Sequence, residues 1–140
     1  MKKETLKKIL NFLSENEGKT PQTYGSIVWK ILFNEPIKKE EANIEGGLYL
    51  NYLDVTSLPE GLKVGGGLYL EGTNITSLPE GLKVGGDLRL HGLEINLLPK
   101  GLEVGDDLFI NSTPLTKYKQ NKLREMIYPG FIKGQITIDI

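Results

Sequence analysis

The chain has one histidine, His91, which lies four residues after Asp87 and twenty residues after Glu71. Histidine and carboxylate side chains together could hold a metal ion or exchange a proton with a substrate. A single histidine is a poor ligand set, however, in a chain that has no cysteine. We therefore expect no metal site, no cofactor, no catalytic residue and no enzymatic activity. We expect Glu71 and His91 to form a solvated lattice of charges with Arg89 and Asp107.

A second set of side chains is suited to recognition. Tyr49, Tyr69, Arg89 and Phe109 follow one another at intervals of twenty residues. Tyrosine and arginine are enriched where binding energy concentrates in protein interfaces. The alternative is that stacked aromatic side chains only stabilise neighbouring strands, by ~0.2–1 kcal/mol per pair. Both roles require an element that brings these four side chains into one row.

That element is an internal repeat of twenty residues, which fills residues 44–104 without insertion. Its copies read IEGGLYLNYLDVTSLPEGLK, VGGGLYLEGTNITSLPEGLK and VGGDLRLHGLEINLLPKGLE, and a degenerate fourth copy begins at Val104. A repeat of this length forms one supersecondary unit, which must stack on its neighbours to bury its apolar face. The sequence therefore predicts a repeat solenoid.

The L-x-L segment of each copy predicts a parallel strand of about three to five residues. Side chains alternate along a strand, so Leu48 and Leu50 point inward and the side chains between and beside them point outward. The outward columns form the concave face, which we predict to bind a protein partner. The predicted binding residues are Tyr49, Asn51, Tyr69, Glu71, Asp87, Arg89, His91, Asp107 and Phe109.

The other half of each copy predicts a non-helical return. Pro59 fixes its own backbone φ near −65° and removes a hydrogen-bond donor, and Gly61 can take the positive φ that closes a turn. The same pair recurs in the next two copies. Gly65–Gly66, and the equivalent pair in the third copy, admit a tight bend before the strand, where a Cβ would collide with the neighbouring copy.

The pattern L-x-L, then L-P-x-G-L, on a period of twenty resembles the short bacterial type of leucine-rich repeat, in its Gly-Gly-x-Leu-x-Leu variant. The resemblance covers residues 44–116 and implies a leucine-rich-repeat parallel sheet. Such repeats occur in secreted effectors and in small phage- and prophage-encoded proteins, which implies a protein-binding role. The chain departs from the family at its ladder asparagine, which is replaced by Leu53, Thr73, Leu93 and Thr113. The secreted ubiquitin ligases with similar repeats use a catalytic cysteine in a separate domain, so the absence of cysteine excludes that activity.

The two ends predict caps, so that the whole chain is an α+β solenoid folding as one unit. Residues 1–43 predict an N-terminal cap of two helices, at 3–15 and 27–33, from apolar residues at helical spacing. Residues 117–140 predict a C-terminal cap of one helix and a final strand, Gln135–Ile140, beside Leu108 and Ile110 with its three isoleucines in the core. The outer edge of that strand is either covered by the C-terminal helix or paired with a second copy as a homodimer.

Charge and composition limit the partners. The formal net charge is −1, and the repeats are mildly acidic, so nucleic acid is an unlikely ligand, with the basic residues of the first helix as its only candidate site. No stretch has the ~20 apolar residues of a membrane span, and the basic start lacks the apolar run of a signal peptide. We expect a cytoplasmic protein that binds another protein, such as a phage- or mobile-element-encoded inhibitor of a host defence protein. An effector-like binding protein is the alternative.

Overall fold

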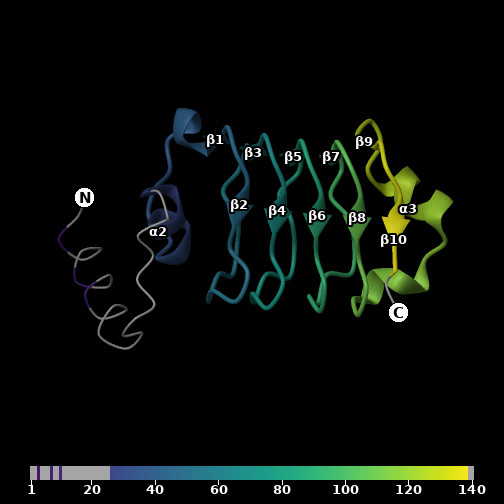
Figure 1. The fold of residues 1–140 in the computed structure, drawn as a ribbon, viewed down its shortest axis with the longest axis horizontal. Coiled ribbons are helices and arrows are strands. Elements are labelled where there is room, and N and C mark those ends of the chain that lie inside the picture. Colours follow the sequence, from purple (N-terminus) through teal and green to yellow (C-terminus); the bar gives the residue numbers. More distant parts are fainter. Residues whose placement is uncertain (1–2, 4–6, 8–9, 11–25, 139–140) are drawn as a thin grey trace.

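Each repeat forms one coil of a solenoid and contributes two short parallel strands to the fold (Figure 1). The computed structural model describes residues 3, 7, 10 and 26–138. Sheet A joins β1 (Asn43–Ile44), β3 (Lys63–Val64), β5 (Lys83–Val84), β7 (Glu103–Val104) and β9 (Phe131–Ile132). Sheet B joins β2 (Leu48–Tyr49), β4 (Leu68–Tyr69), β6 (Leu88–Arg89), β8 (Leu108–Phe109) and β10 (Ile136–Thr137). The predicted solenoid and its parallel sheet are confirmed.

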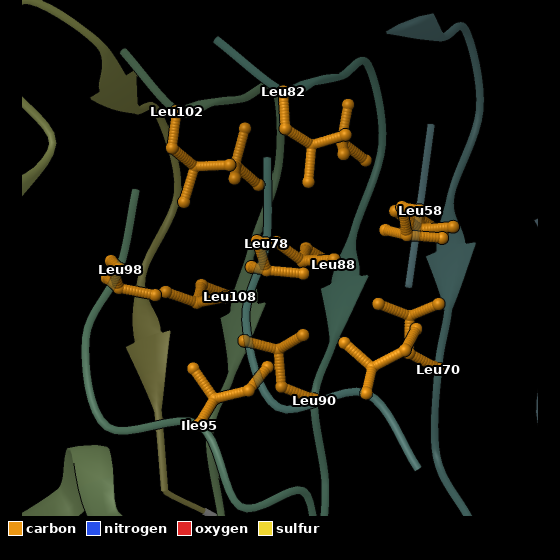
Figure 2. Packing of buried hydrophobic residues seen from close by; sticks show 14 of the residues in the cluster. Leu58, Leu70, Leu78, Leu82, Leu88, Leu90, Ile95, Leu98, Leu102 and Leu108 are labelled. Atoms are coloured by element: carbon orange, nitrogen blue, oxygen red, sulfur yellow. The ribbon is translucent and has the colours of Figure 1, made fainter. Parts of the chain in front are cut away.

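The register of both sheets follows the sequence repeat. Leu48 pairs with Leu68 and Lys63 pairs with Lys83, each twenty residues apart. The predicted inward columns are buried: Leu50, Leu70 and Leu90 are 0% exposed. Figure 2 shows Leu70 and Leu90 inside the solenoid together with leucines from the returning half of the coil, such as Leu78. Because each coil is too thin to enclose its own apolar side chains, the core is continuous along the axis.

The strands differ from the prediction in length and number. Each has two residues instead of three to five, and the Lys63–Val64 segment and its equivalents form sheet A, which the repeat pattern did not predict. Twenty residues must complete a full circuit around the core, so few residues remain for any one face. The return through Pro59 contains no helix, as predicted, and Gly61 has a φ of +74°.

Within residues 26–43, two helical elements precede the first coil. Helix α2 spans Ser26–Leu32 and the 3₁₀ helix η1 spans Lys39–Ala42. Val28 and Ile31 are buried in the same apolar cluster as the leucines of the first coils. The predicted helix at 3–15 lies outside the described residues, apart from Lys3, Lys7 and Leu10.

One ion pair joins α2 to η1 and should make stability depend on pH. Lys30 Nζ lies 2.5 Å from Glu41 Oε2, and the Lys38 backbone N–H donates to Glu41 Oε1 at 3.2 Å. The hydrogen bond from Lys30, and then that from Lys38, lowers the pKa of Glu41 below its ordinary value. Glu41 therefore has a lower pKa in the folded chain than in the unfolded chain, and between these two pKa values the unfolded chain binds more protons. The ion pair therefore stabilises the fold at neutral pH, and this stabilisation is lost as the pH falls through the pKa of the folded state. We expect Glu41→Gln to flatten the fall in melting temperature between about pH 5 and pH 3.

The control for this prediction is Glu40→Gln. Glu40 is exposed and forms no ion pair within the described residues. Thermal melts of the three proteins across the same pH range would contradict the assignment if Glu40→Gln flattened the curve as much as Glu41→Gln did.

A fifth coil follows an insertion of helical segments. The 3₁₀ helix η2 (Pro114–Lys117) and helix α3 (Gln120–Met126) separate β8 from β9. Where the sequence predicted a strand at Gln135–Ile140, the structure has the two-residue strand β10, and its Ile136 pairs with Leu108. The prediction that all its isoleucines are buried is wrong: Ile138 is 50% exposed, because no described residue closes the coil over it. Ile140 lies outside the described residues.

Side chains from α3 reach the carbonyl groups at the outer edge of this last coil. The Arg124 guanidinium donates to Ile132 O at 2.7 Å and to Gly134 O at 3.1 Å. In the coil before, the equivalent carbonyls of Val104 and Asp106 accept hydrogen bonds from the backbone of the fifth coil. Gln120 Nε2 also donates to Ile136 O, at 3.4 Å. Helix α3 therefore contacts this edge through the Arg124 and Gln120 side chains.

Candidate functional site

The side chains at the centre of sheet B form one continuous stack, which we call the aromatic row: Tyr49, Tyr69, Arg89 and Phe109. The rings of Tyr49 and Tyr69 are nearly parallel, with an interplanar angle of 4° and centroids 4.7 Å apart. The Arg89 guanidinium lies 5.4 Å from the Tyr69 centroid and 4.9 Å from the Phe109 centroid. A cation between two ring faces is held by their negative quadrupoles. The sheet register therefore produces the predicted row.

Glycines beside the two tyrosines leave space for their rings. A Cβ on Gly67 would lie 2.8 Å from Tyr69 Oη, and a Cβ on Gly47 would lie 3.1 Å from Tyr49 Oη. Each ring therefore lies over the glycine two residues before it, which directly precedes the strand. A larger residue at either glycine would push the tyrosine ring out of its present position on the sheet.

The next two coils have aspartates at the glycine positions, and these aspartates bind the neighbouring coil. Asp87 Oδ1 accepts a hydrogen bond from the Asp107 N–H at 2.9 Å, and Asp107 Oδ1 accepts one from the Gln135 N–H at 2.8 Å. Both were predicted to face a partner. The structure gives one oxygen of each carboxylate the role of joining successive coils.

The column beside the row contains the remaining polar side chains. Glu71 Oε1 lies 4.0 Å from Arg89 Nη1, and the Glu71 side chain is only 16% exposed. His91 Nδ1 is in contact with Asn111 Nδ2. These side chains differ from the predicted solvated lattice of charges in two respects. The Glu71 side chain is largely buried, and the Asp107 carboxylate accepts a hydrogen bond from the Gln135 backbone. The positive charge of Arg89 faces the negative charge of Glu71, so the centre of the site is close to neutral.

An open hollow of about 630 Å³ lies over these side chains. It brings together seven predicted binding residues but neither aspartate. Asn111 and Tyr52 also line it, although neither was among the predicted binding residues. The residues that line the hollow are Tyr49, Asn51, Tyr52, Tyr69, Glu71, Arg89, His91, Phe109 and Asn111.

Tyr52 could have been identified from its column in the alignment. Its backbone has a φ of +65°, in the left-handed region, and the equivalent residues are Gly72, Gly92 and Ser112. A bulky residue is uncommon in this conformation and indicates strain. The sequence signal was therefore a tyrosine where the next two copies have glycine.

No group of three or more histidine, aspartate or glutamate side chains that could hold a metal ion occurs in the part of the chain that the structure describes. None of the helices described is both long enough and apolar enough to cross a membrane. Comparison with known proteins finds no matching family model, no matching curated protein and no matching solved structure.

Proposed function

We propose that the chain is a non-enzymatic protein-interaction module, which binds its partner in the hollow over sheet B. The observation that carries this proposal is the aromatic row. Its side chains point away from the core, yet they are ordered by stacking: Tyr49 is 58% exposed although one face of its ring is covered by Tyr69. Rigid aromatic and arginine side chains at the centre of a surface lose little conformational entropy when a partner binds.

The size of the surface limits the kind of complex. Five strands at a spacing of ~4.8 Å span ~24 Å, which leaves this face below the ~800 Å² per partner of a standard interface. The partner must therefore also contact a rim of the solenoid, or bind weakly. Tyr52 and Asn111 extend the hollow beyond the central strands and supply part of that rim.

The resemblance to short leucine-rich repeats supports the same class of function. Such repeats occur in small phage-encoded proteins, so we favour an inhibitor of a host protein over a secreted effector. A chain without cysteine can work in the reducing cytoplasm of the cell that expresses it. The acidic character of the coils disfavours nucleic acid as the ligand.

The double variant Tyr69→Ala/Arg89→Ala tests the proposal. Affinity capture from the source cell, with mass spectrometry, gives the candidate partner, and its affinity for purified wild type and variant is then measured. We expect a loss of at least ~30-fold with little change in melting temperature, because truncation of one hot-spot residue costs ~2 kcal/mol or more.

The matched control is Lys63→Ala/Lys83→Ala. These two lysines are exposed and occupy the same two coils, but they lie on sheet A. Equal affinities of the wild type and the Tyr69/Arg89 variant would reject the hollow as the binding surface, as would an equal loss in the lysine control.

A further inference from the structure

Arg89 is held in place at the centre of the hollow. Tyr69 and Phe109, on the two neighbouring strands, lie on either side of it, with ring centroids 5.4 Å and 4.9 Å from the guanidinium carbon. The Arg89 side chain is nevertheless 44% exposed. The N–H donors of a guanidinium lie at its edge, in a rigid planar fork. The two rings therefore fix the position of the cation and leave part of it accessible from the hollow.

The carboxylate beside Arg89 does not occupy these donors. Glu71 Oε1 lies 4.0 Å from Arg89 Nη1, whereas a hydrogen bond between an arginine and a carboxylate is about 2.7–2.9 Å long. The Glu71 side chain is only 16% exposed, so it is largely covered by its neighbours. Glu71 therefore balances the charge of Arg89 but leaves the Nη1 donors to another acceptor.

His91 supplies a second donor on the same side of the coil. It lies two residues after Arg89, is exposed and lines the same hollow. Its Nδ1 is in contact with the Asn111 amide nitrogen, Nδ2. An amide nitrogen can only donate, so Nδ1 accepts and the imidazole proton lies on Nε2. Arg89 and His91 thus both offer hydrogen-bond donors to a ligand in the hollow.

The charges of the coils limit the kind of partner. Residues 44–116 contain four basic and ten acidic residues, a net charge of −6. Asp87 and Asp107 do not line the hollow, and one oxygen of each carboxylate is bound to the next coil. Charges more than ~8 Å apart are largely screened at physiological ionic strength, so for a group in contact with Arg89 its charge outweighs those of carboxylates farther away. A partner with a strongly negative overall charge is still disfavoured.

We propose that the hollow receives a carboxylate side chain of the partner, from an aspartate or glutamate, which accepts hydrogen bonds from Arg89 and His91. This inference rests on the proposed function and names the group that the site recognises. An arginine that its neighbours already hold loses little conformational entropy on binding, and its planar fork fits the two oxygens of a carboxylate. The hollow is open and runs over four coils, from Tyr49 to Asn111, with Arg89 in the third. A partner segment can therefore pass across it and does not have to end there.

The probe for this site is the capped peptide acetyl-Gly-Glu-Gly-amide, titrated into the intact chain and followed by the NMR signals of the Arg89 Nε–H group and the His91 ring. The comparison peptides have glutamine, the neutral isostere, or lysine in place of glutamate. We expect the glutamate peptide to shift both signals, with a Kd on the order of millimolar for a single side chain. Binding should be at least ~5-fold weaker for the glutamine peptide and absent for the lysine peptide. Equal or tighter binding of either comparison peptide would overturn the proposal.

The decisive variant is Arg89→Gln, with Lys117→Gln as its matched control. Glutamine keeps a planar polar group beside the rings but carries no charge. Lys117 Nζ is also next to an aromatic ring, 5.2 Å from the Tyr118 centroid, but Lys117 does not line the hollow. Both substitutions remove a positive charge from the chain, and only Arg89→Gln should weaken binding of the glutamate peptide, by at least ~5-fold. An equal loss in the two variants, or no loss in either, would overturn the role of Arg89.

Glu71→Gln provides a second test, because the sign of its effect depends on the charge of the bound group. This substitution removes the negative charge beside Arg89 and with it a repulsion of the incoming carboxylate. The glutamate peptide should therefore bind ~2–5-fold more tightly to this variant than to the wild type, provided that the melting temperatures of the two proteins agree. Unchanged or weaker binding would contradict a carboxylate as the ligand.

Two outcomes separate this inference from the proposed function. If the glutamate peptide does not bind but Tyr69→Ala/Arg89→Ala abolishes binding of the partner, the inference fails and the proposed function stands. If the peptide binds but the double variant leaves the affinity for the partner unchanged, the proposed function fails and the carboxylate site remains. If neither effect is seen, both fail.

Discussion

Replacement of Leu70 by alanine is expected to lower the free energy of unfolding by ~2–5 kcal/mol, as truncation of a buried leucine does. Leu70 is completely buried, as are Leu50 and Leu90, the residues at the same position of the two neighbouring coils. Figure 2 shows Leu70 and Leu90 in the core. The neighbouring coils are held in register by the ladders of both sheets. They cannot move inward to fill the space, so we expect a loss toward the upper end of this range. Urea denaturation measures it.

The control for Leu70→Ala is Thr76→Ala, in the same coil. Thr76 is exposed and belongs to no strand or helix, so its truncation should change the free energy of unfolding by less than about 0.5 kcal/mol. Similar losses for the two variants would mean that the inward and outward faces of the coil are reversed.

Substitution of Gly85 by alanine should be about as damaging for the opposite reason, because it adds an atom where none fits. A Cβ at this position would lie 2.2 Å from Gly65 O and 3.0 Å from Gly65 C. Both atoms belong to the backbone of the preceding coil, which cannot rotate away as a side chain can. The hydrogen bond from the Gly85 N–H to Val64 O, 2.7 Å long, lies at the same contact. We expect a loss of ~3 kcal/mol, at the upper end of the usual cost of overpacking.

Gly46→Ala is the matched control for this substitution. Gly46 also precedes a strand of sheet B, but a Cβ built on it has no atom within 4 Å. Denaturant unfolding of the two variants should therefore differ by most of the effect of Gly85→Ala. A small effect at both positions would show that successive coils can separate without cost at this bend.

The repeat made the centre of the fold predictable. The period of twenty residues sets which residues pair, and the leucine columns set which side faces the core, so the aromatic row follows from the alignment and from strand geometry. Sheet A was missed because its strands, such as Lys63–Val64, have one polar and one apolar residue and no alternation long enough to recognise.

The fifth coil was only half predicted because the period breaks before it. Val104 pairs with Ile132, twenty-eight residues later, since η2 and α3 are inserted between them. The segment Ile132-Lys133-Gly134-Gln135-Ile136 nevertheless matches both apolar positions and the second glycine position of the repeat, although Lys133 replaces the first glycine. An alignment that allowed one insertion would have found β9 together with β10.

In the site, the residues that sequence reasoning misjudged are those whose role depends on a neighbouring coil. The columns show that Asp87 points outward, but they cannot show that its carboxylate accepts the Asp107 N–H. Likewise Tyr52 stands out in its column, where the next two copies have glycine, but the alignment alone does not show that its ring lines the hollow. Strand alternation predicts whether a side chain points toward or away from the core. A hydrogen bond between two coils also depends on the distance between its donor and acceptor, which the sequence does not give.

Because each central coil repeats the register of the one before, gene duplication of a single repeat would lengthen the molecule without disturbing either end. The carbonyls that Arg124 binds would still belong to the final coil, since α3 and that coil are adjacent in the chain. Each added repeat would insert one new side chain into the aromatic row, at a spacing of ~4.8 Å. A lineage could therefore change what this surface recognises one side chain at a time, by gaining or losing whole repeats, while the core sequence stays the same.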